Sequence, residues 1–198
     1  NLVSFISDTS IKYQDINNTI NKTSKVTSDI QIDYLTYLWD SIDLLNKYLD
    51  VDKKIFAEEE NYNFLNKSII KINSKNIFIS KNCNIQSGCI LDASNGPIIL
   101  NENVIIESGS IIKGPIYIDK NSQVNNGAKL KGNNLIGPYC KIGGEITNSI
   151  FYGYSNKQHD GFLGNSFVGE WVNIGANTNN SNLKNNYSKI KFKFPDTI

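Results

Sequence analysis

The sequence predicts a mainly β protein, a left-handed parallel β-helix built from hexapeptide repeats and preceded by a short helical connector. Three observations predict it. An aliphatic residue returns every six positions, small residues form a column four positions after it, and helical apolar spacing is confined to the N-terminal third of the 198 residues. A repeat of this kind determines the whole fold assignment.

The six-residue period runs uninterrupted from position 100 to position 142. Its members are Leu100, Ile106, Ile112, Ile118, Val124, Leu130, Ile136 and Ile142, and the same period links Ile79, Ile85 and Leu91, and again Phe162, Val168 and Ile174. A period of six fits neither an α-helix nor a simple two-residue alternation. It fits a three-sided prism with about eighteen residues per turn, in which each aliphatic side chain points inward. Two phase breaks, at 94–97 and at 143–161, separate the three runs of this period.

Small or modest side chains follow most of these aliphatic residues four positions later, where a corner of the prism leaves little volume. They are Cys83, Cys89, Val104, Ser110, Ser122, Ala128, Cys140, Val172 and Thr178. All three cysteines fall in this column without a C-x-x-C spacing, so we interpret them as buried packing residues and not as disulfide partners or metal ligands. The position directly after the aliphatic residue is often Gly, Asn or Asp (among them Asn125, Gly137 and Gly143), which predicts tight turns with unusual backbone angles.

The N-terminal third follows a different pattern. Helical spacing predicts an amphipathic helix over about 33–50, with an apolar stripe formed by Leu35, Leu38, Ile42, Leu45 and Leu49 beside Trp39. We expect it to pack on the end of the prism or on a further domain. The expected organisation is a linker or tail of an upstream domain at 1–32, a helical connector at 33–75 and a C-terminally truncated β-helix domain at 76–194. The absence of methionine, even at position 1, predicts a piece of a longer protein.

The amino-acid composition excludes two classes of binding partner, nucleic acids and membranes. With 20 basic and 19 acidic residues the net charge is near zero, so the basic stripe of a nucleic-acid-binding protein and a polybasic membrane patch are both excluded. The apolar runs are too short to span a membrane, and no signal peptide is recognisable. We therefore expect a cytoplasmic protein. The Asn-x-Ser/Thr triplets follow from the high asparagine content and do not indicate glycosylation.

The larger phase break is the expected place for chemistry, since function is found where a repeat is interrupted. Its glycines and polar residues predict a loop that leaves the prism wall. It contains His159, the only histidine, whose neutral imidazole suits a general base in acyl transfer to an amine. Glu145 is a candidate to orient that imidazole. An incidental histidine and a solvated surface acid are the alternative interpretations.

An asparagine-rich run follows at 173–182. Its amides are able to hold sugar hydroxyls or an oxyanion. Solvated turns explain it equally well, because asparagine is abundant throughout the chain.

Five segments of this region resemble one bacterial family: GGE (143–145), GYSNK (153–157), HDGFLGNS (159–166), GEWVNIGA (169–176) and NNSNLKNNY (179–187). They are similar to the C-terminal acetyltransferase half of the bifunctional glucosamine-1-phosphate acetyltransferase/N-acetylglucosamine-1-phosphate uridylyltransferase, in the Bacteroidetes form known as a sugar nucleotidyltransferase. The YLWD segment (37–40), with Asn46, resembles the connector between the two halves of that enzyme. The likeness covers about 33–194.

The resemblance implies a trimeric left-handed β-helix with active sites between subunits. It implies glucosamine 1-phosphate as the substrate and acetyl-CoA as the acyl donor, with a product that feeds UDP-N-acetylglucosamine and cell-wall synthesis. Mg²⁺ belongs only to the uridylyltransferase half, which is absent from this chain, and we expect no metal in the β-helix. The chain also stops at Ile198, before further coils expected to bind CoA, so the piece alone is not assured of activity.

The resemblance also assigns residues. His159 falls on the catalytic base and Glu145 on the acid fourteen positions before it. The remaining matches are Asn173 and Asn182 on sugar- and acetyl-site asparagines, Lys131, at a different spacing, on a basic residue that holds the sugar phosphate, and Ala176 and Thr178 at the cofactor site. Two positions depart from the family: Phe162 stands where a substrate-binding tyrosine is usual, and Thr147 replaces a lysine of the phosphate site.

A hexapeptide-repeat fold suggests three other functions. A hexapeptide-repeat carbonic anhydrase needs three histidines on zinc, which one histidine per chain does not supply. A non-catalytic β-helix that trimerises or regulates a sugar-1-phosphate nucleotidyltransferase stays open as the alternative. Acetylation of a different amino sugar is the third.

Overall fold

The computed structural model describes residues 33–57, 68–180 and 184–189. By its internal contacts the chain divides into two units, 1–34 and 35–198, and only Asp33 and Tyr34 of the first lie in the described part. The expected tail at 1–32 is therefore outside the described residues, as are 58–67 of the expected connector and 181–183 and 190–194 of the expected β-helix domain.

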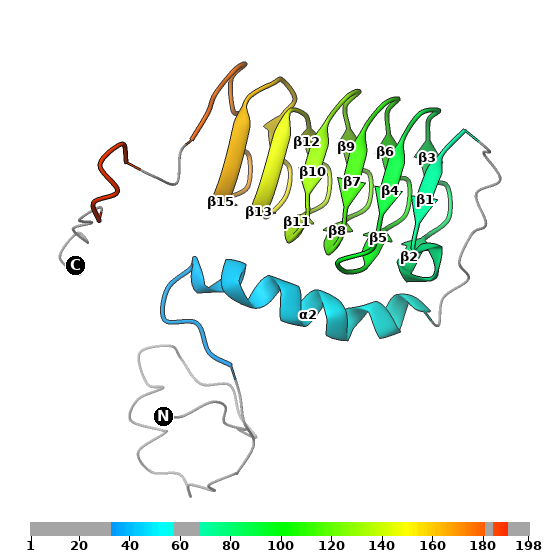
Figure 1. Cartoon of the computed structure of the whole chain (residues 1–198), viewed down its shortest axis with the longest axis horizontal. Helices are drawn as coiled ribbons and strands as arrows, with labels where there is room; N and C mark the ends of the chain where they lie inside the picture. Colours follow the sequence, from blue (N-terminus) through cyan, green and yellow to red (C-terminus); the bar gives the residue numbers. More distant parts are fainter. Residues whose placement is uncertain (1–32, 58–67, 181–183, 190–198) are drawn as a thin grey trace, which may run out of the picture. The chain divides into compact units, whose positions relative to one another are not determined.

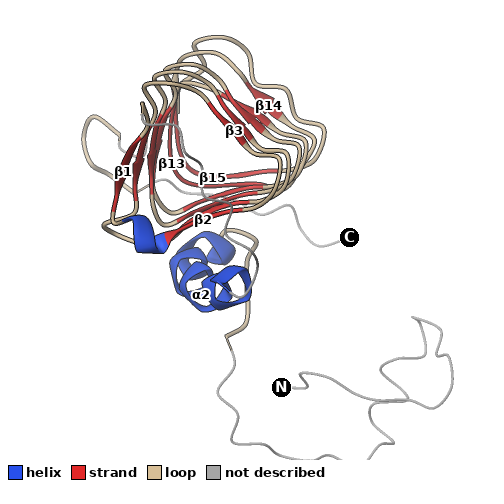
Figure 2. Cartoon of the chain, turned by 90° about the vertical axis from the view of Figure 1, so that its right-hand side faces the viewer, coloured by secondary structure: helices blue, strands red, loops and turns tan. Residues whose placement is uncertain are grey.

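Short parallel strands wind into a three-sided β-helix, which confirms the predicted fold (Figures 1 and 2). Face A contains β1 (Ile70–Ile72), β4 (Ile90–Asp92), β7 (Ile111–Lys113) and β10 (Lys129–Lys131). Face B contains β2 (Ile77–Ile79), β5 (Ile98–Leu100), β8 (Ile116–Ile118) and β11 (Asn134–Ile136). Face C contains β3 (Asn84–Ile85), β6 (Ile105–Ile106), β9 (Gln123–Val124), β12 (Lys141–Ile142) and β14 (Asn156–Lys157).

Two longer strands join faces A and B. In β13 (Glu145–Phe151) the first residues pair with β10 on face A and the last three with β11 on face B. In β15 (Phe162–Val168) the whole strand pairs with β13 in the same way. These two strands therefore carry the wall around a corner.

The inward column forms the core. All eight aliphatic residues from Leu100 to Ile142 are fully buried, so the six-residue period is confirmed. The three cysteines are free and buried, as predicted, and burial raises the pKa of each thiol. Each coil packs mainly on its two neighbours, so the stability of the domain builds up coil by coil.

The length of the coils explains the first phase break. Ile112 pairs with Leu130, eighteen positions later, as a regular coil requires. Leu91 pairs with Ile112, which is twenty-one positions later, so this coil carries three extra residues. The break at 94–97 is thus a small insertion at one corner, and the faces resume in register after it.

The helix before the β-helix is α2 (Asp40–Ala57), a turn or more later than the predicted 33–50. The carboxylate of Asp40 accepts the main-chain N–H groups of Thr36 and Tyr37, each at 2.8 Å, which holds 36–39 in a turn before the helix begins. Leu35 and Leu38 of the predicted stripe are therefore exposed. Acidic residues in the first turn and Lys54 in the last complement the helix dipole.

Helix α2 runs along face B, not on the end of the prism as expected (Figures 1 and 2). Its buried residues Ile42, Leu45 and Leu49 cluster with Ile150 of β13. Near its end, the ring of Phe56 lies 5.7 Å from that of Tyr117, centroid to centroid. The helix covers face B because the outward residues of that face are apolar. None of the helices in the described ranges is both long and apolar enough for a membrane span.

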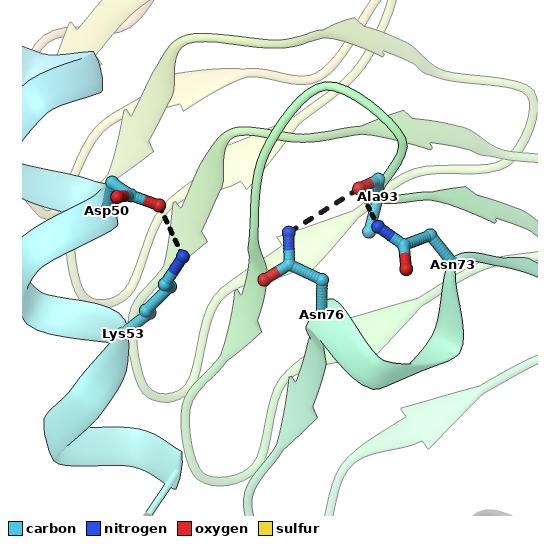
Figure 3. Close-up of polar contacts among 5 residues, drawn as sticks. All are labelled: Asp50, Lys53, Asn73, Asn76 and Ala93. Atoms are coloured by element: carbon cyan, nitrogen blue, oxygen red, sulfur yellow. Dashed lines mark hydrogen bonds and ion pairs between the residues drawn. The ribbon is translucent and has the colours of Figure 1, made fainter.

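Figure 3 shows polar side-chain contacts in the first coil of the β-helix and an ion pair on helix α2. Beside the short η2 helix (Ser74–Asn76), Asn73 Nδ2 donates to the carbonyl of Ala93 at 3.0 Å, and Asn76 Nδ2 reaches the same oxygen at 3.5 Å. Asn73 has a φ of 56°, a left-handed conformation that asparagine tolerates well. On α2, Lys53 pairs with Asp50 at 2.5 Å across one turn.

Candidate active site

The second phase break stays in the wall of the β-helix, so the predicted protruding loop is wrong. Ile142 of β12 pairs with Lys157 of β14 only fifteen positions later, and Phe151 pairs with Ile136 at the same interval. The break therefore records shorter coils, which lack residues at the corners. The turn at 158–161 joins face C to face A at this level.

Glycines allow these short coils to lie close together. A Cβ at Gly143 would lie 2.1 Å from the carbonyl oxygen of Gln158, and one at Gly144 would lie 2.6 Å from that of Gly161. Of the two, only Gly144 has a positive φ, 75°. Unusual backbone angles were thus the wrong explanation for Gly143, where the close approach of the next coil excludes a side chain.

A pocket of about 360 Å³ opens at this corner. It is lined by Gly127, Lys129, Gly144, Glu145, Asp160, Gly161 and Phe162. His159 is exposed and directly precedes Asp160 of this lining. The structure thus brings two predicted site residues, Glu145 and Phe162, into one pocket and places His159 next to it in the chain.

The charged residues of the lining are Lys129, Glu145 and Asp160, and Lys131 lies next to Glu145. The carboxylate of Glu145 pairs with Lys131 at 2.7 Å, so among the described residues its partner is a lysine and not the imidazole. The contact predicted between Glu145 and His159 stays a prediction. Lys129, which no sequence motif indicated, lines the pocket and pairs in register with Glu145.

Phe162 has the opposite orientation to the one its six-residue phase predicted. Leu163 is the buried, inward residue of this coil, and Phe162 is half-buried on the outer side. Its ring lies over Gly164, where an added Cβ would be 2.7 Å from the ring Cζ. The phase prediction is wrong because the preceding coils are shorter than eighteen residues.

The last described coil holds the remaining predicted residues. Asn173, Ala176 and Thr178 are exposed, and Asn182 lies outside the described residues. The Thr178 hydroxyl donates to the carbonyl of Gly175 at 2.9 Å. These side chains do not line the pocket, so their predicted roles remain untested.

Two asparagines of the same run bind the main chain. Asn179 Oδ1 accepts the N–H of Phe162 at 2.7 Å. Asn180 Oδ1 accepts the N–H of Gly164 at 2.9 Å, while its Nδ2 donates to the carbonyl of Gly164, also at 2.9 Å. Their side chains thus bind main-chain N–H and carbonyl groups of β15, as a further strand would. Neither of the two sequence interpretations, ligand binding or solvated turns, included this role.

Several known proteins are similar in sequence to this chain. The bifunctional protein GlmU of Wigglesworthia glossinidia brevipalpis is 34% identical over 124 residues, 58% of this chain and 25% of that protein. GlmU of Picosynechococcus is 32% identical over 104 residues, 50% of this chain and 22% of that protein. An uncharacterized acetyltransferase, YaiX of Escherichia coli, is 28% identical over 134 residues, 67% of this chain and 56% of that protein.

The chain carries a GlmU-like hexapeptide-repeat domain. It spans only 22–25% of the length of these two GlmU relatives. No family model matches the sequence, and no solved structure matches the chain.

One further residue of the GlmU-like domain was missed by sequence reasoning. Lys157 occupies an inward position of face C and is fully buried. Its Nζ donates to the carbonyl of His159 at 2.7 Å, with longer contacts of 3.4 Å to those of Gly143 and Asp160. Burial lowers the pKa of this ammonium, and the charge of Asp160 opposes the shift. Recognising the fifteen-residue coil would have revealed it, because Lys157 stands where an aliphatic residue is due.

Proposed function

We propose that this chain transfers an acetyl group from acetyl-CoA to the amine of an amino-sugar 1-phosphate, glucosamine 1-phosphate. The observation that carries the proposal is that the exposed His159 directly precedes Asp160, which lines a pocket together with Glu145, Lys129 and Phe162. The similarity to GlmU proteins and to a named acetyltransferase supports the same reaction class.

His159 acts as the general base in this proposal. Acetyl-CoA supplies the acetyl group as a thioester. As the amine nitrogen bonds to the thioester carbonyl carbon, His159 takes the proton that the nitrogen loses. The carbon–sulfur bond then breaks, and the departing CoA thiolate takes that proton from the imidazolium of His159 to leave as the thiol. A neutral imidazole suits this step near neutral pH.

The pocket suits the sugar phosphate. Its volume of about 360 Å³ falls in the range usual for small-molecule sites, about 300–1,000 Å³. Lys129 lines the pocket and has no ion-pair partner among the described residues, whereas Lys131 is paired with Glu145. In this proposal Lys129 faces the phosphate and Phe162, which also lines the pocket, contacts the sugar. Glu145 is available for the sugar or, once a substrate is bound, for the imidazole.

The remaining assignments rest on the resemblance. Asn173 and Asn182 hold the sugar and the acetyl group, and Ala176 and Thr178 contact CoA. Exposed, small side chains at 176 and 178 leave room for such a chain on the last described coil. We place the protein in the cytoplasm, as a trimer and as part of a bifunctional enzyme for UDP-N-acetylglucosamine.

The test is release of free thiol from acetyl-CoA with glucosamine 1-phosphate and a panel of other amino sugars. We expect activity that His159→Ala lowers about a hundredfold or more, since general base catalysis contributes about 10²–10⁴-fold. The control is Lys113→Ala, an exposed change on β7 that should leave activity unchanged. Equal activity in His159→Ala and the wild type would remove His159 from the reaction. No activity with any sugar in the folded full-length protein would favour the non-catalytic trimerisation domain.

A further inference from the structure

The main-chain carbonyls of three consecutive residues in the turn that contains His159 all accept hydrogen bonds from other parts of the chain. Asn125 Nδ2 donates to the carbonyl of Gln158 at 3.0 Å, and Lys157 Nζ donates to that of His159 at 2.7 Å. The N–H of Asn177 donates to the carbonyl of Asp160 at 2.9 Å. With these oxygens bound, the peptide planes of 158–160 have fixed orientations.

Lys157 is not explained by core packing. The same inward column of face C otherwise contains Ile85, Ile106, Val124, Ile142 and Ile174. An aliphatic residue there would avoid the desolvation of an amine, and apolar replacements of buried ions are often neutral or stabilising. What lysine adds is a group of N–H donors directly below the His159 carbonyl.

The direction of this contact matters for the imidazole. In an extended or turn backbone, fixing a residue's carbonyl inward constrains the direction in which its own side chain leaves the wall. His159 is exposed, while its main-chain carbonyl accepts a hydrogen bond from the fully buried amine of Lys157. The side chain of His159 therefore lies on the outer side of the wall and its carbonyl on the inner side.

We propose that Lys157, assisted by Asn125, is a positioning residue that holds the 158–160 turn so that the His159 imidazole faces the pocket side. The catalytic consequence of this inference rests on the proposed acetyl transfer, but the structural consequence does not. Lys157 touches no substrate, because it is buried in the core.

The decisive measurement uses the fact that the chain contains one histidine. In a carbon–proton correlation spectrum of the 198-residue chain, the imidazole of His159 therefore gives one set of signals. Lys157→Met keeps an unbranched chain of similar length but removes the donors. We expect its His159 signals to shift and to broaden or double at a fixed neutral pH.

Matched variants separate positioning from general destabilisation. Ile106→Ala lies in the same inward column, three coils from Lys157, and disturbs packing without touching 158–160. It should leave the His159 signals as in the wild type. Asn125→Asp removes the donor to Gln158 at nearly constant size and should perturb them, so it serves if Lys157→Met does not fold. Lys157→Arg, which restores donors, should recover part of the wild-type spectrum.

Activity provides the second measurement. With the acetyl-transfer assay, Lys157→Met should lower kcat by about ten- to a hundredfold, the effect of a misplacement of about 1 Å, while KM changes little. A Lys157→Met spectrum identical to the wild type at His159 would overturn the inference. A perturbed spectrum of the 198-residue chain, together with a full-length protein that lacks acetyltransferase activity, would support the positioning role and refute the proposed function, so the two failures are distinguishable.

Discussion

The carboxylate of Glu145 lies 2.7 Å from the ammonium of Lys131, although the strand register pairs Glu145 with Lys129. Within face A, residues two apart on one strand point to the same side, so both lysines and the carboxylate lie on the outer surface. Lys131 is thereby occupied, and Lys129 lines the pocket. The charge available to an anionic substrate group comes first from Lys129.

This arrangement predicts different effects for the two lysines. Lys129→Ala should raise the KM for the sugar phosphate about tenfold, equivalent to about 1.4 kcal/mol, because the described lining of the pocket loses its lysine. Lys131→Ala should raise it less, and should change the free energy of unfolding by no more than about 1 kcal/mol, since exposed ion pairs contribute little. Steady-state kinetics and urea unfolding measure both. A larger KM effect from Lys131→Ala would place the phosphate at the residue that the resemblance indicated.

Burial of Lys157 predicts a pH dependence of stability. Because burial lowers the pKa of its ammonium in the folded state, the unfolded chain binds one more proton at this group between the lowered pKa and the ordinary value of about 10.4. The free energy of unfolding contributed by Lys157 therefore rises with pH across that range. The nearby Asp160 charge makes the rise smaller without reversing it.

The measurement is the difference in unfolding free energy between the wild type and Lys157→Met, from neutral pH to just above the ordinary lysine pKa. We expect the difference to rise in favour of the wild type and then to level off. The buried thiols of Cys83, Cys89 and Cys140 have raised pKa values and act in the opposite direction, but they are common to both proteins and cancel. Lys141→Met, an exposed lysine on the same face, is the control, with a flat difference. A flat or falling curve for Lys157 contradicts the expectation.

Much of the fold was predictable because one physical requirement repeats along the chain. Every coil must bury one aliphatic side chain per face, so Leu100 to Ile142 record the prism directly in sequence. The corner cysteines follow for the same reason. The helix was less predictable at its start, because the Asp40 carboxylate binds the preceding main chain and excludes Leu35 and Leu38 from the helix.

The candidate site was harder to predict because coil length changes where the period fails. A period of six assumes eighteen residues per turn, and it places Phe162 inward and leaves 143–161 outside the wall. Coils of fifteen to seventeen residues instead bring Leu163 and Lys157 inward and Phe162 outward. Coil shortening is decided by contacts between neighbouring coils, such as Gly143 against Gln158, which no local pattern contains.

The Asn180 side chain stabilises β15 through hydrogen bonds to its main chain. Its side chain bonds both main-chain groups of Gly164 and donates to the Ser166 hydroxyl at 2.9 Å. Asn180→Ala should lower the free energy of unfolding by about 1–3 kcal/mol, because main-chain groups lose their partners. The Gly164 amide should also exchange its hydrogen faster. Asn173→Ala, at an exposed position of the same coil, is the control with wild-type exchange. Unchanged exchange at Gly164 would show that the asparagine does not act as a strand substitute.

Gly164 offers a test of the Phe162 ring that leaves the ring chemistry intact. An added Cβ at Gly164 would lie 2.7 Å from the Phe162 Cζ and 3.3 Å from Thr147 Cγ2, so the ring must move. Because the contact is with the far end of a side chain, Gly164→Ala should cost little stability. It should raise the KM for the sugar substrate in the same direction as Phe162→Ala. Gly169→Ala, where an added Cβ meets nothing within 4 Å, is the matched control and should leave KM unchanged. If Gly164→Ala displaces the ring in a crystal structure and KM stays at the wild-type value, Phe162 does not contact the sugar, and the other residues of the lining bind the substrate without it.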